Sequence, residues 1–197
     1  MSRSAVGLRE AVPDDLDFLS TLWADSLRRV GPEEQQADVR ALLRRAGGAA
    51  EERVVVALLG GERVGAVVLH LAPMSPVNPE PVVQVLMAEV VAGCRRRGAG
   101  QALVEAAVAF AEERGVAQVA AAAVAGSREA NRFMARLGFG PWASYRVAPT
   151  SRVRSRITAQ QPVRAGGARP VGRVLAVRRS MRRAGDAPPQ VGASGPS

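Results

Sequence analysis

The sequence predicts one mixed α/β domain followed by a basic tail, and three observations lead to this prediction. The chain has 197 residues, 47% hydrophobic and 23% charged, enough for a core of about 100–150 residues plus an extension. Its apolar periodicity alternates between strand-like and helix-like in the order β-α-α-β-β-β-α-β-α-β over residues 5–148. Its net charge of +9 comes from the C-terminal residues 151–197. We therefore assign residues 1–150 to the domain and residues 151–197 to the tail.

The first half of the domain is predicted to contain a strand, two helices and a β-hairpin. After a short strand at residues 8–11, a proline and two acids favour a helix start at Pro13. This helix places Trp23 on its apolar face, as a core residue, and a second helix follows Pro32. Two β-rich runs at 53–59 and 63–71, separated by a glycine turn, predict the hairpin.

The second half is predicted to alternate strands and helices. Four prolines within residues 73–81 predict irregular structure, and the long apolar run Val82–Val91 is then typical of a central strand. A glycine loop and a helix ending near Gly115 come next. The remaining predicted elements are a strand at 116–124, a helix at 127–137 and a last strand at 142–147.

The excess positive charge lies in the tail. Residues 1–150 carry 17 Arg and 17 Asp or Glu, whereas residues 151–197 carry 10 Arg and one acid, Asp186. Because the domain is neutral, the high pI is not evidence that the domain binds nucleic acid. The tail has no aromatic residue and is rich in Arg, Gly and Pro, so we expect it to be largely disordered, with a short basic helix possible near residues 171–184.

Several classes of protein are excluded by composition. Cys94 and His70 are the only residues of their kinds, so we expect no intrachain disulfide and no metal site. No apolar run approaches the ~18 residues of a membrane helix, and residues 1–10 lack the apolar core of a secretory signal. We therefore expect a cytoplasmic protein that does not bind a membrane.

The junction after the 82–91 strand is the most informative segment. Arg95, Arg96 and Arg97 precede Gly98-Ala99-Gly100 at a helix N-terminus, where free N–H groups and a partial positive charge can hold a phosphate. A Walker loop is excluded because the chain has no lysine, and a dinucleotide fingerprint is excluded because position 103 is leucine. The residues alone leave two interpretations open: a pyrophosphate site, or a tight turn beside solvated arginines.

At these residues the chain resembles the GNAT superfamily of acyl-CoA N-acyltransferases. Arg95-x-x-Gly98-x-Gly100 is similar to the family's motif between its fourth strand and third helix. Leu8-Arg9-x-Ala11-x-x-x-Asp15 and Phe133-x-x-x-x-Gly138-Phe139 resemble its opening and its late helix-and-strand motif. The resemblance implies a mixed, mostly antiparallel central sheet of six to seven strands flanked by about four helices.

The resemblance also implies a site for acetyl-CoA. The N–H groups of Arg96 to Gly100 would bind the pyrophosphate, and the backbone of Val90 and Val91 would pair with the pantetheine arm. That arm would lie where the fourth and fifth strands splay apart. The full set of cofactor-binding residues implied is Val90, Val91, Arg95, Arg96, Arg97, Gly98, Ala99, Gly100, Gln101, Ser127, Asn131 and Met134.

Glu89 is the predicted general base. A carboxylate in an otherwise apolar strand should have a raised pKa and could take a proton from the acceptor ammonium directly or through water. The alternative is that Glu89 points to the far face and pairs with an arginine. Strict alternation places Glu89 on the face of Met87 and Val91, and a bulge would break that parity.

The acid is less well defined than the base. Met134 occupies the position where the family usually has a tyrosine, and a thioether cannot donate a proton. Tyr145, the only tyrosine of the chain, is the predicted acid, with Ser127 and water as alternatives.

The predicted function is an acetyl-CoA-dependent N-acetyltransferase that acts on a primary amine of a small molecule or a peptide. One alternative is an acyl-CoA-binding module with weak catalysis, to which Met134 points. Another is association with nucleic acid through the tail, by nonspecific phosphate contacts. The sequence does not identify the acceptor, the acyl chain length or the choice between monomer and homodimer.

Overall fold

The computed structural model describes residues 5–122, 127–143 and 146–160. The chain divides into two compact units, Met1–Trp142 and Ala143–Ser197. The α-helices and strands, in chain order, are β1 (Val6–Glu10), α1 (Leu16–Leu22), α2 (Pro32–Gly48), β2 (Glu52–Leu59), β3 (Glu62–Ser75), β4 (Asn78–Val90), α3 (Ala99–Glu113), β5 (Val119–Ala121), α4 (Arg128–Arg136) and α5 (Thr150–Gln160). Two 3₁₀ turns, Pro13–Asp15 and Ala92–Cys94, precede α1 and α3.

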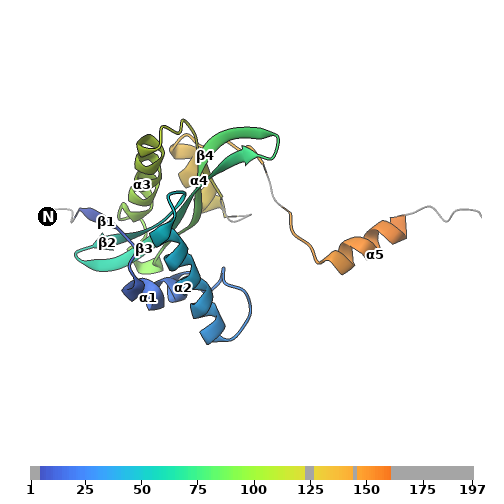
Figure 1. Cartoon of the computed structure of the whole chain (residues 1–197), viewed down its shortest axis with the longest axis horizontal. Helices are drawn as coiled ribbons and strands as arrows, with labels where there is room; N and C mark the ends of the chain where they lie inside the picture. Colours follow the sequence, from blue (N-terminus) through green and yellow to red (C-terminus); the bar gives the residue numbers. More distant parts are fainter. Residues whose placement is uncertain (1–4, 123–126, 144–145, 161–197) are drawn as a thin grey trace, which may run out of the picture. The chain divides into compact units, whose positions relative to one another are not determined.

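The described strands form one sheet in the order β1-β2-β3-β4-β5. Figure 1 labels the first four of them. The first four strands pair antiparallel, and β5 pairs parallel to β4. This confirms the predicted mixed, mostly antiparallel sheet with a central fourth strand. The described residues hold five strands where six to seven were predicted, and five α-helices where about four were predicted.

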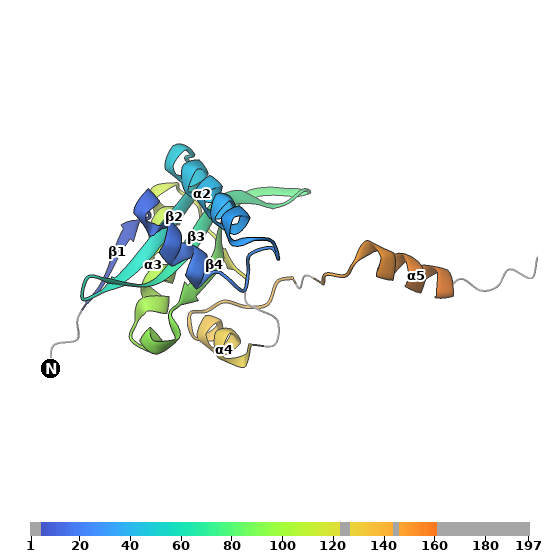
Figure 2. The ribbon, with the colours of Figure 1, turned by 90° about the horizontal axis from the view of Figure 1, so that it is seen from below.

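Helices cover both faces of the sheet, α3 on one and α1 with α2 on the other (Figures 1 and 2). Successive residues of β2 and β3 point to opposite faces of the sheet and pack into two separate hydrophobic cores. The α3-side core contains Phe110 and Leu103 of α3, both at most 1% exposed. The other core is built around Leu19 of α1 and Trp23, which directly follows that helix. The sheet therefore presents two distinct faces.

The prolines around residue 76 do not interrupt the strands, contrary to the sequence prediction. β3 continues to Ser75 and β4 starts at Asn78, so the two strands extend as a long hairpin in which Pro73 pairs with Pro81. A proline only removes one donor, and the distal part of this hairpin has no third strand in the described register that would need that donor. The ladder is irregular between Pro73 and Ser75, where it accommodates this loss.

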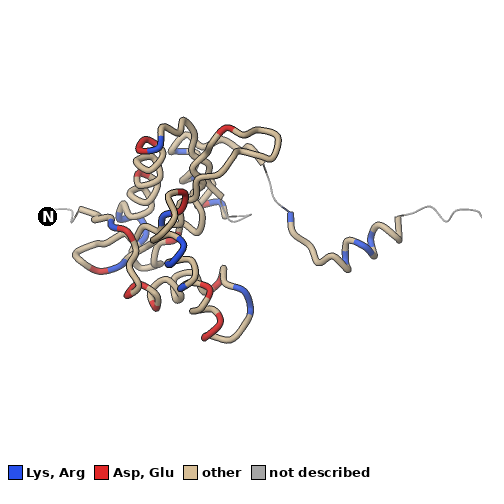
Figure 3. Tube along the Cα trace, viewed as in Figure 1, with Lys and Arg blue, Asp and Glu red and all other residues tan. Residues whose placement is uncertain are grey.

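The end of the described chain differs from the prediction. β5 covers only part of the predicted strand at 116–124, and residues 142–143 and 146–147 are not in a strand. α5 occupies Thr150–Gln160, where mostly irregular structure was predicted, and it carries arginines but no acid (Figure 3). The helix considered near 171–184 lies outside the described residues. No helix among the described residues is long and apolar enough to cross a membrane.

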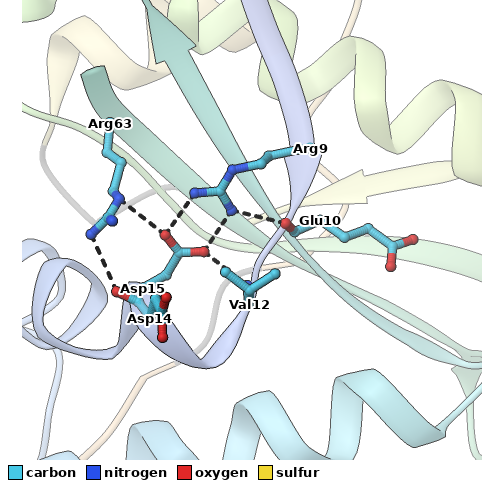
Figure 4. A network of polar contacts seen from close by, with 6 residues as sticks. All are labelled: Arg9, Glu10, Val12, Asp14, Asp15 and Arg63. Carbon is cyan, nitrogen blue, oxygen red and sulfur yellow. Dashed lines mark hydrogen bonds and ion pairs between the residues drawn. The ribbon is translucent and has the colours of Figure 1, made fainter. Parts of the chain in front are cut away.

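A buried ion cluster holds the start of the domain together (Figure 4). The Asp15 side chain is 0% exposed and accepts hydrogen bonds from both Nη atoms of Arg9, at 2.6 and 2.8 Å, and from the Val12 amide at 2.8 Å. Arg63 of β3 approaches the same carboxylate at 3.1 Å and donates to the Asp14 carbonyl at 3.3 Å. The motif Arg9…Asp15 thus has a structural role: it ties β1 and the turn before α1 to β3.

Candidate functional site

A β-bulge in β4 organises the candidate site. Val68 pairs with Leu86 and Ala66 pairs with Glu89, which leaves Met87 and Ala88 opposite the single residue Val67. Met87 adopts a left-handed backbone with φ +52°. Because the bulge adds one residue, every side chain after it lies on the face opposite to the one that strict alternation gives.

The bulge places Glu89 on the face covered by α1 and α2. Its cross-strand partner Ala66 belongs to the core on that side, and the Ser26 hydroxyl lies 3.4 Å from the Glu89 carboxylate. Burial raises the pKa of Glu89 above its ordinary value, and Asp25 raises it further, against the opposing effects of Ser26 and Arg95. No ion pair to Glu89 occurs among the described side chains, so this carboxylate is not held as an arginine partner.

The bulge also sets the direction of the backbone groups at the end of β4. The Val91 amide donates to the Val64 carbonyl of β3 at 2.9 Å, and the Val91 carbonyl accepts from the Cys94 amide at 2.8 Å. The polar groups of Val91 are thus used within the chain. Since adjacent residues of a strand point their amides to opposite edges, the N–H and C=O of Val90 are directed away from β3, toward the β5 side.

On that side the two strands pair over a short stretch. β5 pairs with Val83, Gln84 and Val85 of β4, while β4 continues to Val90. The last backbone bond between the two segments runs from the Ala122 amide to the Val85 carbonyl, at 3.3 Å. Beyond it, no described residue pairs with this edge of β4. Among the described residues, the β5-side edge of β4 at Val90 therefore has no strand partner, and the predicted divergence of the fourth and fifth strands stays a prediction.

The glycine loop after β4 forms a cradle of backbone amides. Arg96 and Gly98 both have left-handed backbones, with φ +61° and +93°, and Gly98 is the N-cap residue of α3. The first intrahelical bond of α3 runs from the Ala102 amide to the Gly98 carbonyl. The amides of Ala99, Gly100 and Gln101 consequently lack intrahelical acceptors, and they stand at the positive end of the helix dipole. Such a cradle suits an anion.

The three arginines before the cradle are exposed. Arg95 donates through Nε to the Val90 carbonyl at 3.4 Å, and Arg96 lies 3.9 Å from Glu129 of α4. Exposed pairs of this kind contribute at most about 1 kcal/mol. Arg97 is exposed as well. These side chains supply mobile positive charge around the amides, whereas the amides themselves are fixed by the backbone.

Helix α4 packs beside the cradle. Phe133 lies against Gly100, where an added Cβ would come 3.6 Å from its ring. Ser127 caps α4 by accepting from the Ala130 amide at 3.2 Å, and the Asn131 side chain donates to the Ser127 carbonyl at 2.9 Å. Met134, half-buried, is on the same helix. Tyr145 lies outside the described residues.

The side chains of two other predicted site residues have their contacts elsewhere. Ala99 is 2% exposed, so its side chain belongs to the core, and the Gln101 amide side chain donates to Glu105 at 3.0 Å. Gln101 also lines a cavity of about 440 Å³ between α3, β5 and residues 137–139. Neither Glu89 nor Val90 lines that cavity. The cavity is therefore separate from the part of the candidate site that these two residues form. No group of three potential metal ligands occurs in the described ranges.

Three residues that sequence analysis did not assign to the site shape it. Trp23, expected only as core, donates its indole N–H to the Met87 carbonyl at 2.8 Å, and Ser26 contacts Glu89. Gly65 faces Val90 so closely that a Cβ would lie 2.7 Å from the Glu89 carbonyl oxygen. No local pattern indicates these contacts, because each joins residues far apart in the chain.

Solved structures resemble this fold over 74% of the chain. A transcriptional regulator from Bacillus halodurans C-125 matches with TM-score 0.61 and 23% identity, over 99% of its own length. An aminoglycoside N-acetyltransferase, AAC(6')-Iy, in complex with CoA matches with TM-score 0.62 and 17% identity, over 95% of its length. A ribosomal-protein-alanine N-acetyltransferase from Brucella melitensis biovar Abortus 2308 matches with TM-score 0.58 and 20% identity, over 99% of its length. At these identities the similarity concerns the fold.

The family comparison is more specific. No curated protein matches the chain. The model of the Acetyltransferase (GNAT) family matches residues 16–139, from the start of α1 to Phe139 after α4. This range contains the β4 bulge and the amide cradle, as well as most of the first unit. The chain therefore belongs to the GNAT family of acetyltransferases.

Proposed function

We propose that this protein is an N-acetyltransferase that moves the acetyl group of acetyl-CoA to a primary amine. Family membership supports acyl transfer as the general reaction. The β4 bulge is the observation that carries the proposal, because it directs the Val90 backbone toward the β5 side and the Glu89 carboxylate toward α1 and α2. A donor and a base thus serve one reaction from adjacent residues. The cytoplasm remains the proposed compartment.

The chain offers a fitting site for CoA. The amides from Arg96 to Gln101 would hold the pyrophosphate, and the exposed arginines would add charge-assisted contacts. Val90 would pair with the pantetheine arm along the edge of β4 that faces away from β3. Solved relatives of this fold were crystallised with CoA and with a bisubstrate analogue of CoA. Ser127 and Asn131 already bond to each other and to α4, so their contribution would come from their remaining donor and acceptor capacity.

The chemistry divides among few residues. Acetyl-CoA supplies an activated acyl group as a thioester. Glu89 takes the proton from the acceptor ammonium, and its raised pKa suits a base that works near neutral pH. The Val90 N–H donates to the carbonyl oxygen as negative charge develops there. The new N–C bond forms as the C–S bond breaks. The nitrogen then releases its second proton to solvent, and the leaving sulfur receives a proton from Tyr145, Ser127 or water.

The experiment that tests this function is thiol release from acetyl-CoA with a panel of primary amines, including small diamines, aminoglycosides and peptides. We expect at least one amine to raise thiol release above hydrolysis and to gain the mass of one acetyl group. A chain that binds CoA but acetylates none of these amines is instead an acyl-CoA-binding module. A chain that does not bind CoA contradicts the proposal and that alternative alike.

Gly98→Ala is expected to weaken CoA binding at least tenfold, which is about 1.4 kcal/mol. The substitution places a Cβ on a residue with φ +93°, where a side chain is strained by about 1–2 kcal/mol, so the amide cradle must distort. Titration calorimetry with CoA measures the change. Gly93→Ala is the matched control, since Gly93 has an ordinary φ and open space around its Cβ position. Equal affinities for both variants would show that the cradle does not hold CoA.

A further inference from the structure

The indole of Trp23 makes a long-range contact to the centre of the bulge. Trp23 follows α1 and is 1% exposed, and its Nε1–H donates to the Met87 carbonyl at 2.8 Å across 64 residues of sequence. A buried indole N–H needs an acceptor, and a carbonyl freed from the ladder by a bulge needs a donor. Each group therefore satisfies the other.

Met87 needs such support more than an ordinary strand residue does. Its φ of +52° places a side chain in the left-handed region, which disfavours every residue except glycine and, to a smaller extent, asparagine. No glycine stands at either bulged position, 87 or 88. The strain has to be offset by contacts made only in the bulged form, and the bond from Trp23 is one of them.

The conformation of Met87 matters because Glu89 follows it by two residues. Were the strand to become regular, Glu89 would move to the α3 face or the register beyond it would slip by one residue. Gly65 opposes a slip, since its close approach to Val90 fits one register only. Loss of the bulge would thus remove the carboxylate from Ser26 and Asp25, on the side of α1 and α2.

We propose that Trp23 is a positioning residue for the proposed base: its indole N–H holds the left-handed Met87 and thereby keeps Glu89 on the face of α1 and α2. This inference rests on the proposed acetyltransferase function for its kinetic consequence. Its structural consequence, the placement of Glu89, is independent of turnover. Trp23 acts through Met87 and Glu89 and touches no reacting atom.

The first variant is Trp23→Phe, which keeps an aromatic ring and removes the N–H. We expect kcat to fall about tenfold or more, because the bulge loses a bond to a buried carbonyl. CoA affinity should fall less than kcat, about threefold, because the amide cradle does not involve Trp23 and only the contact of Val90 with the pantetheine arm depends on the bulge. Trp142→Phe is the matched control: Trp142 is the other tryptophan, is 70% exposed, and its replacement should leave both quantities unchanged.

Rescue separates positioning from packing. Glycine accepts φ +52° without strain, so Met87→Gly in the Trp23→Phe background should restore kcat at least fivefold, although it removes further core atoms. If Trp23 only filled space in the core, Met87→Gly would remove still more core atoms and could not restore kcat. If the double variant is no faster than Trp23→Phe, the proposal is wrong.

One further variant covers the case in which Trp23→Phe unfolds, and one further measurement covers the case in which no amine is acetylated. Benzothienylalanine at position 23, in the Trp142→Phe background, retains the shape of the indole and replaces the N–H by sulfur. An NMR titration of the Glu89 carboxyl in the free protein then reports its surroundings without turnover. We expect its pKa to fall toward the ordinary glutamate value as the carboxylate leaves its buried site. If the pKa of Glu89 is the same with and without the indole N–H, the proposed role of Trp23 is wrong. If no amine of the panel is acetylated, only the proposed acetyltransferase function is wrong.

Discussion

Replacing Glu89 with glutamine is expected to lower kcat by about 10²–10⁴, the usual range for loss of a positioned general base. Glutamine preserves size and hydrogen bonding to Ser26 but cannot accept the proton of the acceptor ammonium. The wild-type rate should rise with pH through the raised pKa of Glu89, as the carboxyl becomes the carboxylate, and the variant should lose this rise. The measurement is kcat/KM for the best amine from pH 5 to 9.

The control for this substitution is Glu80→Gln. Glu80 lies on the same strand, β4, but is exposed near the tip of the β3–β4 hairpin. Its removal should leave kcat and the pH profile as in the wild type. A Glu89→Gln variant that retains full turnover, with an unchanged pH profile, would mean that the ammonium loses its proton elsewhere, for example to water.

Local signals explain why much of the fold was predictable. Strand and helix periodicities, a glycine turn at Gly60-Gly61 and a glycine N-cap at Gly98 are encoded within a few residues, and the structure contains the corresponding elements. The amide cradle was predictable for the same reason, since glycines between an apolar strand-like run and an apolar helical run indicate a strand-to-helix turn.

The bulge was not predictable from local sequence. Methionine rarely adopts a positive φ, so nothing at Met87 indicates a bulge, and its stabilising partner Trp23 lies 64 residues away. Strict alternation would have placed Glu89 on the opposite face. The prediction of irregular structure at the prolines of the β3–β4 hairpin was wrong for a related reason. The effect of a proline depends on whether a neighbouring strand needs the missing N–H donor, which is a property of the sheet.

The ion cluster at the start of the domain gives a sequence motif a structural role that the sequence does not indicate. In the sequence, Arg9 and Asp15 carry only a resemblance to a family motif, whereas in the structure they form an ion pair. The carboxylate is fully buried, yet both of its oxygens have partners, so the cluster fixes the turn before α1. Trp23 follows α1, so the position from which its indole N–H reaches the Met87 carbonyl of β4 depends on this ion cluster.

Asp15→Asn is expected to lower the free energy of unfolding by about 2–3 kcal/mol at pH 7. This is less than the about 3–5 kcal/mol for breaking a fully buried pair, because Arg9 and Arg63 are 34% and 40% exposed and can regain water. Urea unfolding measures the change. Asp14→Asn is the matched control, because only the backbone carbonyl of Asp14 takes part in the cluster, and its effect should stay within about 0.5 kcal/mol.

Acid should remove the difference between Asp15→Asn and the wild type. Burial alone would raise the pKa of Asp15, but the hydrogen bonds from Arg9 and Val12 and the charges of Arg9 and Arg63 outweigh it and lower that pKa. The unfolded chain, with an aspartate pKa of about 3.9, binds this proton first as pH falls. The contribution of Asp15 is therefore complete above that pH and is lost as pH falls through the lower pKa of the folded chain. If the variant and the wild type differ equally at pH 7 and at the acid end, the ion cluster is not the source of the stability.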